Sequence, residues 1–188
     1  MRDFKEIAEE HIRVLQDSIE LYRQNLKQAA QLCINALAGK ARILVCGNGG
    51  SAADAQHFAA ELVGRYETER KGLAAIALST DTSAITAIGN DYGFDEVFSR
   101  QIRALACKED VLVAISTSGN SSNIVQAAKE AREAGMKIIA FTGQNGGRLG
   151  EMADVLFAAA SKRTARIQEI HEIGLHALAE AIETETCR

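Results

Sequence analysis

Residues 42–62 constrain the fold most, because they join a short apolar run, a glycine-rich turn and a helical pattern without a break. The apolar run 43–46 is typical of a buried strand, and the turn 47–51 reads Gly-Asn-Gly-Gly-Ser. Helical spacing of apolar residues follows from about Ala52. Glycine lets the backbone approach a ligand closely, and the free N–H groups in a helix's first turn favour anions. This stretch therefore predicts a phosphate-type site between a strand and a helix.

The same predicted helix carries His57 and Glu61 four residues apart, so that both side chains lie on one face. An acid/base pair or two metal ligands would then lie near a bound phosphate, as in an enzyme for a small phosphorylated molecule. Each part also has a simpler interpretation, namely a structural turn, a surface or capping histidine, and a solvated glutamate. The turn lacks the Gly-Lys-Ser/Thr of a Walker loop and the third glycine of a Rossmann fingerprint.

Composition narrows the class of protein. The chain has 188 residues, which is enough for one α/β domain with a sizeable core, and its formal net charge is −4. No basic run suggests a nucleic-acid surface, and no apolar run approaches the ~18 residues of a membrane span. The N-terminus lacks the apolar core of a signal peptide. The cysteines lie far apart and indicate ordinary thiols in a reducing cytoplasm: Cys33, Cys46, Cys107 and Cys187.

Residues 2–38 carry apolar side chains at three- and four-residue spacing and predict a long helix that stops at Gly39. An unbroken helix of this length would measure ~55 Å, more than the diameter of a small domain. A bend near Asp17 or near residues 23–25 is one way to shorten it. In either case we expect the first half to pack against something outside its own domain, and oligomerisation is the economical explanation.

Five apolar runs alternate with helical patterns along the rest of the chain. The runs span residues 43–46, 73–78, 110–115, 137–141 and 154–158. Helices are expected over 52–62, 84–88, 94–106, 123–134, a short piece ending near 152, and 164–185, with a loop at 89–93. Such alternation predicts a parallel sheet covered by helices on both faces. We therefore expect one domain over residues 39–188, with residues 1–38 as a helical extension.

A second polar cluster, Ser-Thr-Ser-Gly-Asn-Ser at 116–121, follows the third strand as the glycine turn follows the first. Ligands of open α/β sheets bind at the carboxyl ends of the strands. Hydroxyls and backbone N–H groups at a helix N-terminus suit a phosphate without any Lys or Arg. A serine-rich N-cap is the alternative, but the cluster has more hydroxyls than capping needs.

The motifs CGNGGS, HFAAEL, GNDYGF, STSGNS and RIQEIHEIGLH together resemble the sugar isomerase (SIS) domain family. Within it, they are similar to the isomerases that convert sedoheptulose 7-phosphate to D-glycero-D-manno-heptose 7-phosphate for lipopolysaccharide or capsule synthesis. The resemblance covers nearly the whole chain. It implies a flavodoxin-like five-stranded parallel sheet and a cytoplasmic homotetramer with sites completed between subunits. It also implies one zinc ion per subunit.

Carried over by motif, the resemblance assigns roles to particular residues. It implies an acid/base pair at Glu61 and His176, and zinc ligands at His57, Glu61, Gln168 and His176. Substrate contacts fall on Asn48, Gly49, Gly50, Ser51, Glu61, Asn90, Asp91, Ser116, Thr117, Ser118, Ser121 and Gln168. The chain departs from the family pattern at Ala52 and Ala53, at Gly174, which is expected to interrupt the last helix, and at Glu172, which adds an acid between Gln168 and His176.

A non-catalytic SIS protein that regulates replication initiation by binding the initiator DnaA is the alternative, and the SAADAQHFAA and ETER strings resemble it. In that relative the acid/base positions are not both kept. This chain keeps Glu61, His176 and the STSGNS cluster, which favours the isomerase. A sugar-phosphate sensor without chemistry is a third class.

Isomerisation needs a base over the C1–C2 edge, an acid at the oxygens and stabilisation of an enediolate. Glu61 is the candidate base and His176 the candidate acid, with zinc polarising the carbonyl. The ligand pair Gln168 and His176 poses a geometric problem, because they lie ~12 Å apart along a straight helix whereas ligands of one zinc lie ~3.5 Å apart. The side chains would lean together, the helix would distort at Gly174, or two subunits would share the ion. His171 should face elsewhere, about 140° around the helix from His176.

Overall fold

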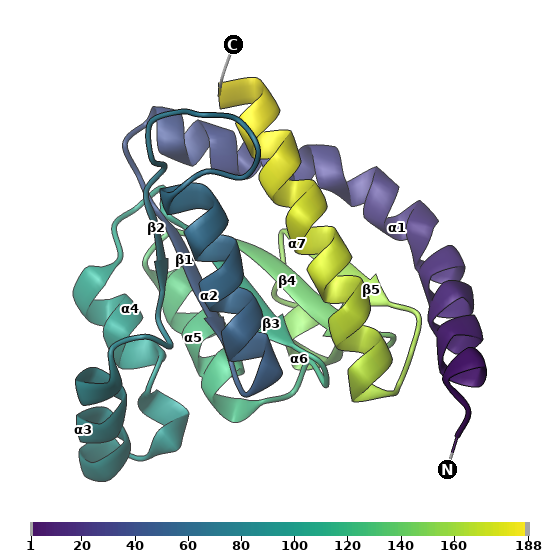
Figure 1. The fold of residues 1–188 in the computed structure, drawn as a ribbon. Helices are drawn as coiled ribbons and strands as arrows, with labels where there is room; N and C mark the ends of the chain where they lie inside the picture. The colour runs from purple at the N-terminus through teal and green to yellow at the C-terminus, as the bar shows by residue number, and fades with distance from the viewer. Residues whose placement is uncertain (1, 187–188) are drawn as a thin grey trace.

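A computed structural model describes residues 2–186 of the chain (Figure 1). The strands are β1 (Ile43–Gly47), β2 (Ala75–Ala77), β3 (Val111–Ser116), β4 (Lys137–Gly143) and β5 (Val155–Ala159). The helices are α1 (Phe4–Ala38), α2 (Gly50–Val63), α3 (Thr82–Tyr92), α4 (Ser99–Leu105), α5 (Ser122–Glu133), α6 (Gly147–Gly150) and α7 (Thr164–Thr186), with a 3-10 turn η1 (Phe94–Glu96). All five predicted strands are therefore present.

The strands form one sheet in the order β2-β1-β3-β4-β5, and every neighbouring pair is parallel. This is the flavodoxin-like order, which confirms the expected fold class. Every residue of β1 and β3 is buried, because helices cover both faces of the sheet. Strand order reverses between β1 and β3, so the loops after these two strands lie side by side at one edge.

Two apolar layers hold the helices to the sheet. Side chains of α1, α2 and α7 pack against one face, around Val45, Val113 and Phe141. Side chains of α4, α5 and α6 pack against the other face, around Leu44 and Leu112. Figure 1 shows α2 and α7 side by side in front of the sheet, with α1 crossing behind α7. The pairing of α2 with α7 brings residues near 57 and 176 together.

Helix α1 is one continuous helix of 35 residues that curves along its length (Figure 1). The hydroxyl of Ser18 donates to the carbonyl of Val14 and accepts from the backbone N–H of Ala160, and such back-bonding is one known cause of helix bending. From Val14 onward one face of α1 packs on its own subunit, against β5 and α7. Part of the first half therefore packs on its own subunit, while Phe4 and Ile19 stay exposed, and packing against a second subunit stays a prediction.

Two predicted boundaries were wrong. Residues 89–92, expected as a loop, form the last turn of α3, because Asp81 caps its start and the chain leaves the helix only at Gly93 (φ 92°). Residues 94–106 are not one helix. The hydroxyl of Ser99 donates to the carbonyl and carboxylate of Glu96, separating η1 from α4.

The glycine in the last helix has a packing role. Helix α7 runs from Thr164 to Thr186 without interruption, so the expectation that Gly174 interrupts it was wrong. A Cβ atom on Gly174 would lie 2.6 Å from the ring of Tyr22 and 2.9 Å from that of Phe141. The missing side chain therefore allows α1 and β4 to pack closely against α7.

Among residues 2–186, no helix combines the length and the apolar run that crossing a membrane would need. Cys33 and Cys46 are buried and Cys107 is exposed, and none of the three is in a disulfide with another described residue. Burial raises the pKa of the Cys33 and Cys46 thiols to about 12, so both stay protonated. Cys187 lies outside the described residues.

Candidate functional site

The glycine turn closes over the start of α2. Gly49 has φ 57° and ψ −121°, a left-handed conformation that favours glycine, and α2 begins at the next residue. A Cβ atom on Gly50 would lie 2.3 Å from the amide nitrogen of Gln168, so this α7 side chain lies directly on the turn. The sequence predicted a glycine turn, and the structure adds that α7 forms its far wall.

The serine cluster after β3 does not cap α5 in the way the alternative interpretation required. Ser121 is the N-cap residue, yet its side chain makes no capping hydrogen bond in the described chain. Its hydroxyl instead accepts from the hydroxyl of Ser116 at 3.1 Å, while the Ser118 hydroxyl accepts from the backbone N–H of Asn120. The Ser116 and Ser121 hydroxyls thus face one another across the loop, as a shared anion site would need.

Both loops line one cavity of about 310 Å³. Its wall consists of Asn48, Gly49, Gly50, Ser51, Ile115, Ser116, Thr117, Ser121, Thr164 and Gln168. Within the described chain, none of these is Lys or Arg, so the anion-binding groups are hydroxyls and the backbone N–H groups that begin α2 and α5. Most of the substrate contacts expected from the sequence therefore meet in one place.

Three expected substrate contacts, besides Glu61, lie outside this cavity. Ser118 lines a neighbouring hollow of about 160 Å³ with Lys162 and Asn145. Asn90 and Asp91 lie in the last turn of α3, where the Asn90 amide donates to the Asp91 carboxylate at 2.8 Å and both are exposed. Figure 1 shows α3 at the edge of the molecule, apart from α7. One subunit does not bring these two residues to the cavity.

Asn48 is held by α5 rather than left free to turn. Its amide nitrogen donates to the side-chain oxygen of Asn123 at 2.8 Å, and the Asn123 amide donates back at 2.9 Å. This reciprocal pair ties the glycine turn to the first turn of α5, directly after the second loop. Asn123 and Thr164 were not predicted from the sequence, although a hydroxyl at the first position of α7 was a usable signal for Thr164.

One α2–α7 cluster gathers two histidines and two glutamates. The Nε2 atom of His57 lies 3.0 Å from a carboxylate oxygen of Glu61, one turn further along α2. Its Nδ1 atom lies 2.6 Å from Oε1 of Glu172 on α7. The Nε2 atom of His176 lies 3.4 Å from the His57 Nε2 atom and 3.5 Å from Glu172 Oε1. The two rings meet edge to face, with centroids 4.9 Å apart.

The donor set of this cluster fits a divalent metal ion. Donor atoms of His57, Glu172 and His176 all lie within 4.8 Å of one another, and Glu61 touches His57. Imidazole nitrogens and carboxylate oxygens suit Zn²⁺ and related ions. Gln168 lies on the same face of α7 as Glu172 and His176, but its side chain packs against Gly50. The unbroken α7 removes helix distortion at Gly174 as a way to bring Gln168 and His176 together.

His171 faces away from the cluster, as the helical repeat predicted. It is fully buried, and its Nε2 atom lies 2.9 Å from the carbonyl oxygen of Thr142. Burial lowers the pKa of His171 to about 4, although its hydrogen bond to Thr142 works in the opposite direction. The ring is therefore neutral near pH 7 and serves as a packing residue beside Phe141.

Asp54 is a neighbour of the cluster that the sequence reasoning missed. It lies one turn before His57 on α2, a three-residue spacing that could have indicated it. Its Oδ2 atom is buried and finds no hydrogen-bond partner among residues 2–186. Burial, and then the charge of Glu172, raise the pKa of Asp54 to about 6, while His57 lowers it. The cluster thus concentrates negative charge that a cation would offset.

Comparison with known proteins adds a family. The model of the SIS domain matches residues 8–143. The chain is 53% identical over 173 residues to a phosphoheptose isomerase of Helicobacter pylori, covering 92% of this chain and 90% of that protein. Two solved phosphoheptose isomerases share its structure. The Neisseria gonorrhoeae enzyme has a TM-score of 0.90 at 50% identity, with coverage of 96% and 98%, and the Francisella tularensis enzyme has 0.92 at 38%, with 98% and 100%.

Proposed function

The chain belongs to the SIS domain family and, within it, to the phosphoheptose isomerases, and we propose that it catalyses isomerisation where α2 and α7 meet. It is an isomerase of heptose phosphates, and we propose that its product feeds heptose synthesis for lipopolysaccharide or capsule. One observation supports placing the reaction between α2 and α7. The first turns of α2 and α7 line the phosphate-type cavity, and later turns of the same two helices carry Glu61 and His176.

The substrate we propose is sedoheptulose 7-phosphate, and the product is D-glycero-D-manno-heptose 7-phosphate. The phosphate would take the hydroxyls of Ser116 and Ser121 and the backbone N–H groups of both helix starts. The sugar chain would then run along α2 and α7 toward the cluster. Gln168, which lies between the two regions on α7, would contact the sugar on the way.

Glu61 and His176 would carry the proton transfers. Glu61 takes a proton from C1 of the ketose, giving an enediol, and returns it to C2. His176 gives a proton to the oxygen at C2 and accepts one from the hydroxyl at C1, so the carbonyl moves from C2 to C1. Each proton that leaves one carbon or oxygen arrives at its neighbour, and no redox partner is needed. The Nε2 atom of His57 lies 3.0 Å from the Glu61 carboxylate, so the two side chains face the same place.

We propose that His57, Glu61, Gln168 and His176 hold one zinc ion in each subunit. A divalent ion, when bound, supplies positive charge that polarises the carbonyl and stabilises the enediolate. The support is the approach of the His57 and His176 Nε2 atoms to 3.4 Å, with the Glu61 carboxylate 3.0 Å from the first. The charge of three nearby carboxylates adds to it: Asp54, Glu61 and Glu172. Gln168 would have to turn from Gly50 toward His176 to join it.

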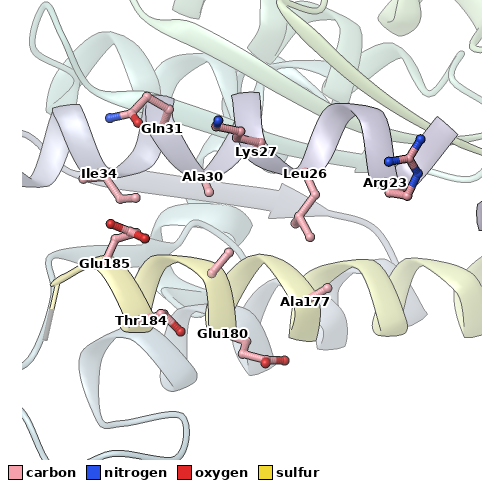
Figure 2. A pocket seen from close by; sticks show the side chains of 11 residues that line it. Arg23, Leu26, Lys27, Ala30, Gln31, Ile34, Ala177, Glu180, Thr184 and Glu185 are labelled. Carbon is pink, nitrogen blue, oxygen red and sulfur yellow. The ribbon is translucent and has the colours of Figure 1, made fainter. Parts of the chain in front are cut away.

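We propose that the protein is a homotetramer assembled through residues 1–38, with the domain over residues 39–188 carrying the site. A groove of about 550 Å³ runs between α1 and α7 (Figure 2). Figure 2 shows Leu26 and Ile34 of α1 pointing toward α7 across it. Beside it lies an almost wholly apolar hollow of about 250 Å³ that includes Ile19 and Ile173. These two side chains are 50% and 40% exposed, so a second copy would bury them.

Assembly would also complete the site. Asn90 and Asp91 are expected substrate contacts that lie far from the cavity of their own subunit. A neighbouring copy could supply them. We place the protein in the cytoplasm, because the thiols of Cys33, Cys46 and Cys107 are unpaired among the described residues and thiols persist in reducing compartments.

A direct assay tests the function. Purified protein with zinc supplied should convert sedoheptulose 7-phosphate to the aldose, detected by chromatography of the sugar phosphates. Binding of the ketose without product would indicate a sensor. No turnover together with tight binding to DnaA would indicate the replication regulator, which no comparison favours.

A further inference from the structure

Glu172 is the one acidic side chain of the cluster to which neither the motifs nor the proposed reaction gives a role. It lies one turn after Gln168 and one turn before His176, so it shares their face of α7. Its side chain is 31% exposed, and its Oε1 atom contacts both histidines of the cluster. The two contacts differ in length, since the atom lies 2.6 Å from His57 and 3.5 Å from His176.

The ring of His57 has a carboxylate at each of its nitrogens. Nε2 faces Glu61 at 3.0 Å and His176 at 3.4 Å, so three donor atoms converge on that side of the ring. Nδ1, on the other side, faces Glu172, which is its one hydrogen-bonding or ionic contact among residues 2–186. A neutral imidazole carries its proton on one nitrogen and offers a lone pair at the other. Whichever nitrogen holds the proton decides where His57 can bind an ion.

We infer that Glu172 is a positioning residue, which accepts the Nδ1–H of His57 and so leaves Nε2 unprotonated toward Glu61 and His176. This inference rests on the proposed function, because it concerns the ion that those donors would hold. A carboxylate on the second nitrogen of a ligating histidine fixes the tautomer and the ring direction and makes the ligand more basic. Glu172 meets the geometric requirement with the shortest contact in the cluster.

The alternative is that Glu172 is itself a ligand. Its Oε1 atom would then have to leave the Nδ1 atom of His57 and turn toward His176. That move would give up a contact of 2.6 Å for one that is now 3.5 Å. It would also leave the His57 Nδ1–H without its acceptor. The observed distances therefore favour positioning over ligation.

Metal affinity in the absence of substrate tests the inference. The probe is Zn²⁺, titrated into the metal-free full chain against a competing chelator, for the wild type, Glu172→Gln and Glu172→Leu. Both variants should bind roughly 10- to 100-fold more weakly, the usual loss when a ligand's outer partner is removed. Glu133→Gln, which removes the same charge from the exposed end of α5, is the matched control and should bind as the wild type does.

Two spectroscopic readouts separate positioning from a general loss of structure. Bound Co²⁺ should show the same coordination number in Glu172→Gln as in the wild type, and ¹⁵N spectra should show the His57 proton leaving Nδ1 in Glu172→Leu. Unchanged zinc affinity in both variants, or an altered Co²⁺ coordination number, would overturn the inference. Failure of the isomerase assay would not, because these measurements use no sugar.

Discussion

The imidazole Nε2 atoms of His57 and His176 lie 3.4 Å apart, although the two residues are separated by 119 positions in the chain. The contact exists because α2 and α7 pack beside one another on the same face of the sheet. The contact therefore brings the HFAAEL motif of α2 and the RIQEIHEIGLH motif of α7 into one cluster. The two histidines are expected to behave as a unit rather than as independent surface residues.

The first prediction concerns metal content. Either His57→Ala or His176→Ala should lose most of the bound zinc, because each removes a nitrogen donor from the same group. The wild type should contain about one zinc per chain, measured by metal analysis after dialysis. Chelation should lower activity without unfolding the sheet, since the core is complete without an ion.

His171→Ala is the internal control for that experiment. It should lower the thermal midpoint, because it leaves a cavity and removes the hydrogen bond between the ring and the Thr142 carbonyl in the core. Its zinc content should stay at the wild-type level, since His171 faces away from the cluster. Zinc loss as severe as in His176→Ala would mean that the ligand face of α7 has been misassigned.

The second prediction concerns the base. Glu61→Gln keeps the shape of the side chain but removes its basicity, so turnover of the ketose phosphate should fall by roughly 10²–10⁴-fold. The variant should elute at the wild-type mass and keep its thermal midpoint. Steady-state kinetics of the aldose product provide the measurement. Turnover near that of the wild type would remove Glu61 from the mechanism.

The fold was predictable where local patterns and packing agree. Buried strands such as β3 are short apolar runs followed by turn residues, and a parallel sheet makes them apolar throughout. The boundaries of α3 were not predictable in the same way, because Gly89 and Asn90 are typical of turns. Capping by Asp81 and the contacts of α3 with η1 override that local preference.

The site was predictable as a list of residues but not as an arrangement. The motifs indicate both Gly50 and Gln168 as substrate contacts. Only the packing of α7 on the glycine turn shows that the two residues touch. Glu172 was noted as an extra acid, but its partner on α2 depends on the relative rotation of two helices. Sequence spacing along one helix carries no information about that rotation.

The third prediction concerns assembly. Ile19→Asp places a charge in the apolar hollow between α1 and α7 and should reduce the mass in solution below that of a tetramer, measured by light scattering. Ile19 is half exposed in one subunit, so the subunit itself should stay folded. This substitution is cleaner than removing residues 1–22, because that truncation would also remove Val14 and Ser18, which pack on their own subunit.

Leu105→Asp is the matched control, because Leu105 is an exposed apolar residue at the end of α4, on the other face of the sheet. It should keep the native mass. If the Ile19 variant also keeps that mass, the hollow is not an interface. If assembly completes the site through Asn90 and Asp91, the dissociated Ile19 variant should lose turnover as well.

The last prediction concerns acid stability and the loop between α2 and β2. Glu183 on α7 is only 5% exposed and accepts hydrogen bonds from the backbone N–H groups of Tyr66, Glu67 and Thr68. The guanidinium of Arg70 donates to the same carboxylate at 2.9 Å. Burial acts to raise the pKa of Glu183, but the three N–H donors and Arg70 outweigh it and lower the pKa from 4.5 to about 2.

The sign of the effect follows from that lowered pKa. A carboxylate with a lower pKa in the folded state stabilises the fold above its unfolded pKa, and the stabilisation is lost as the pH falls toward the folded value. Glu183→Gln leaves N–H donors and the buried Arg70 without their charge partner, and should cost about 3 kcal/mol of unfolding free energy near pH 7. The difference from the wild type should shrink as the pH falls from about 5 toward about 2.

Urea denaturation of both proteins across this pH range measures the difference, and Glu20→Gln is the control. Hydrogen bonds from Arg23 and Gln24 lower the pKa of Glu20 to about 2 as well, yet its side chain is 63% exposed. Exposed pairs contribute little, because water and salt screen them. The Glu20 variant should therefore match the wild type at every pH. A Glu183 difference that stays constant from pH 6 to pH 3 would contradict the prediction and show that its role is packing rather than charge.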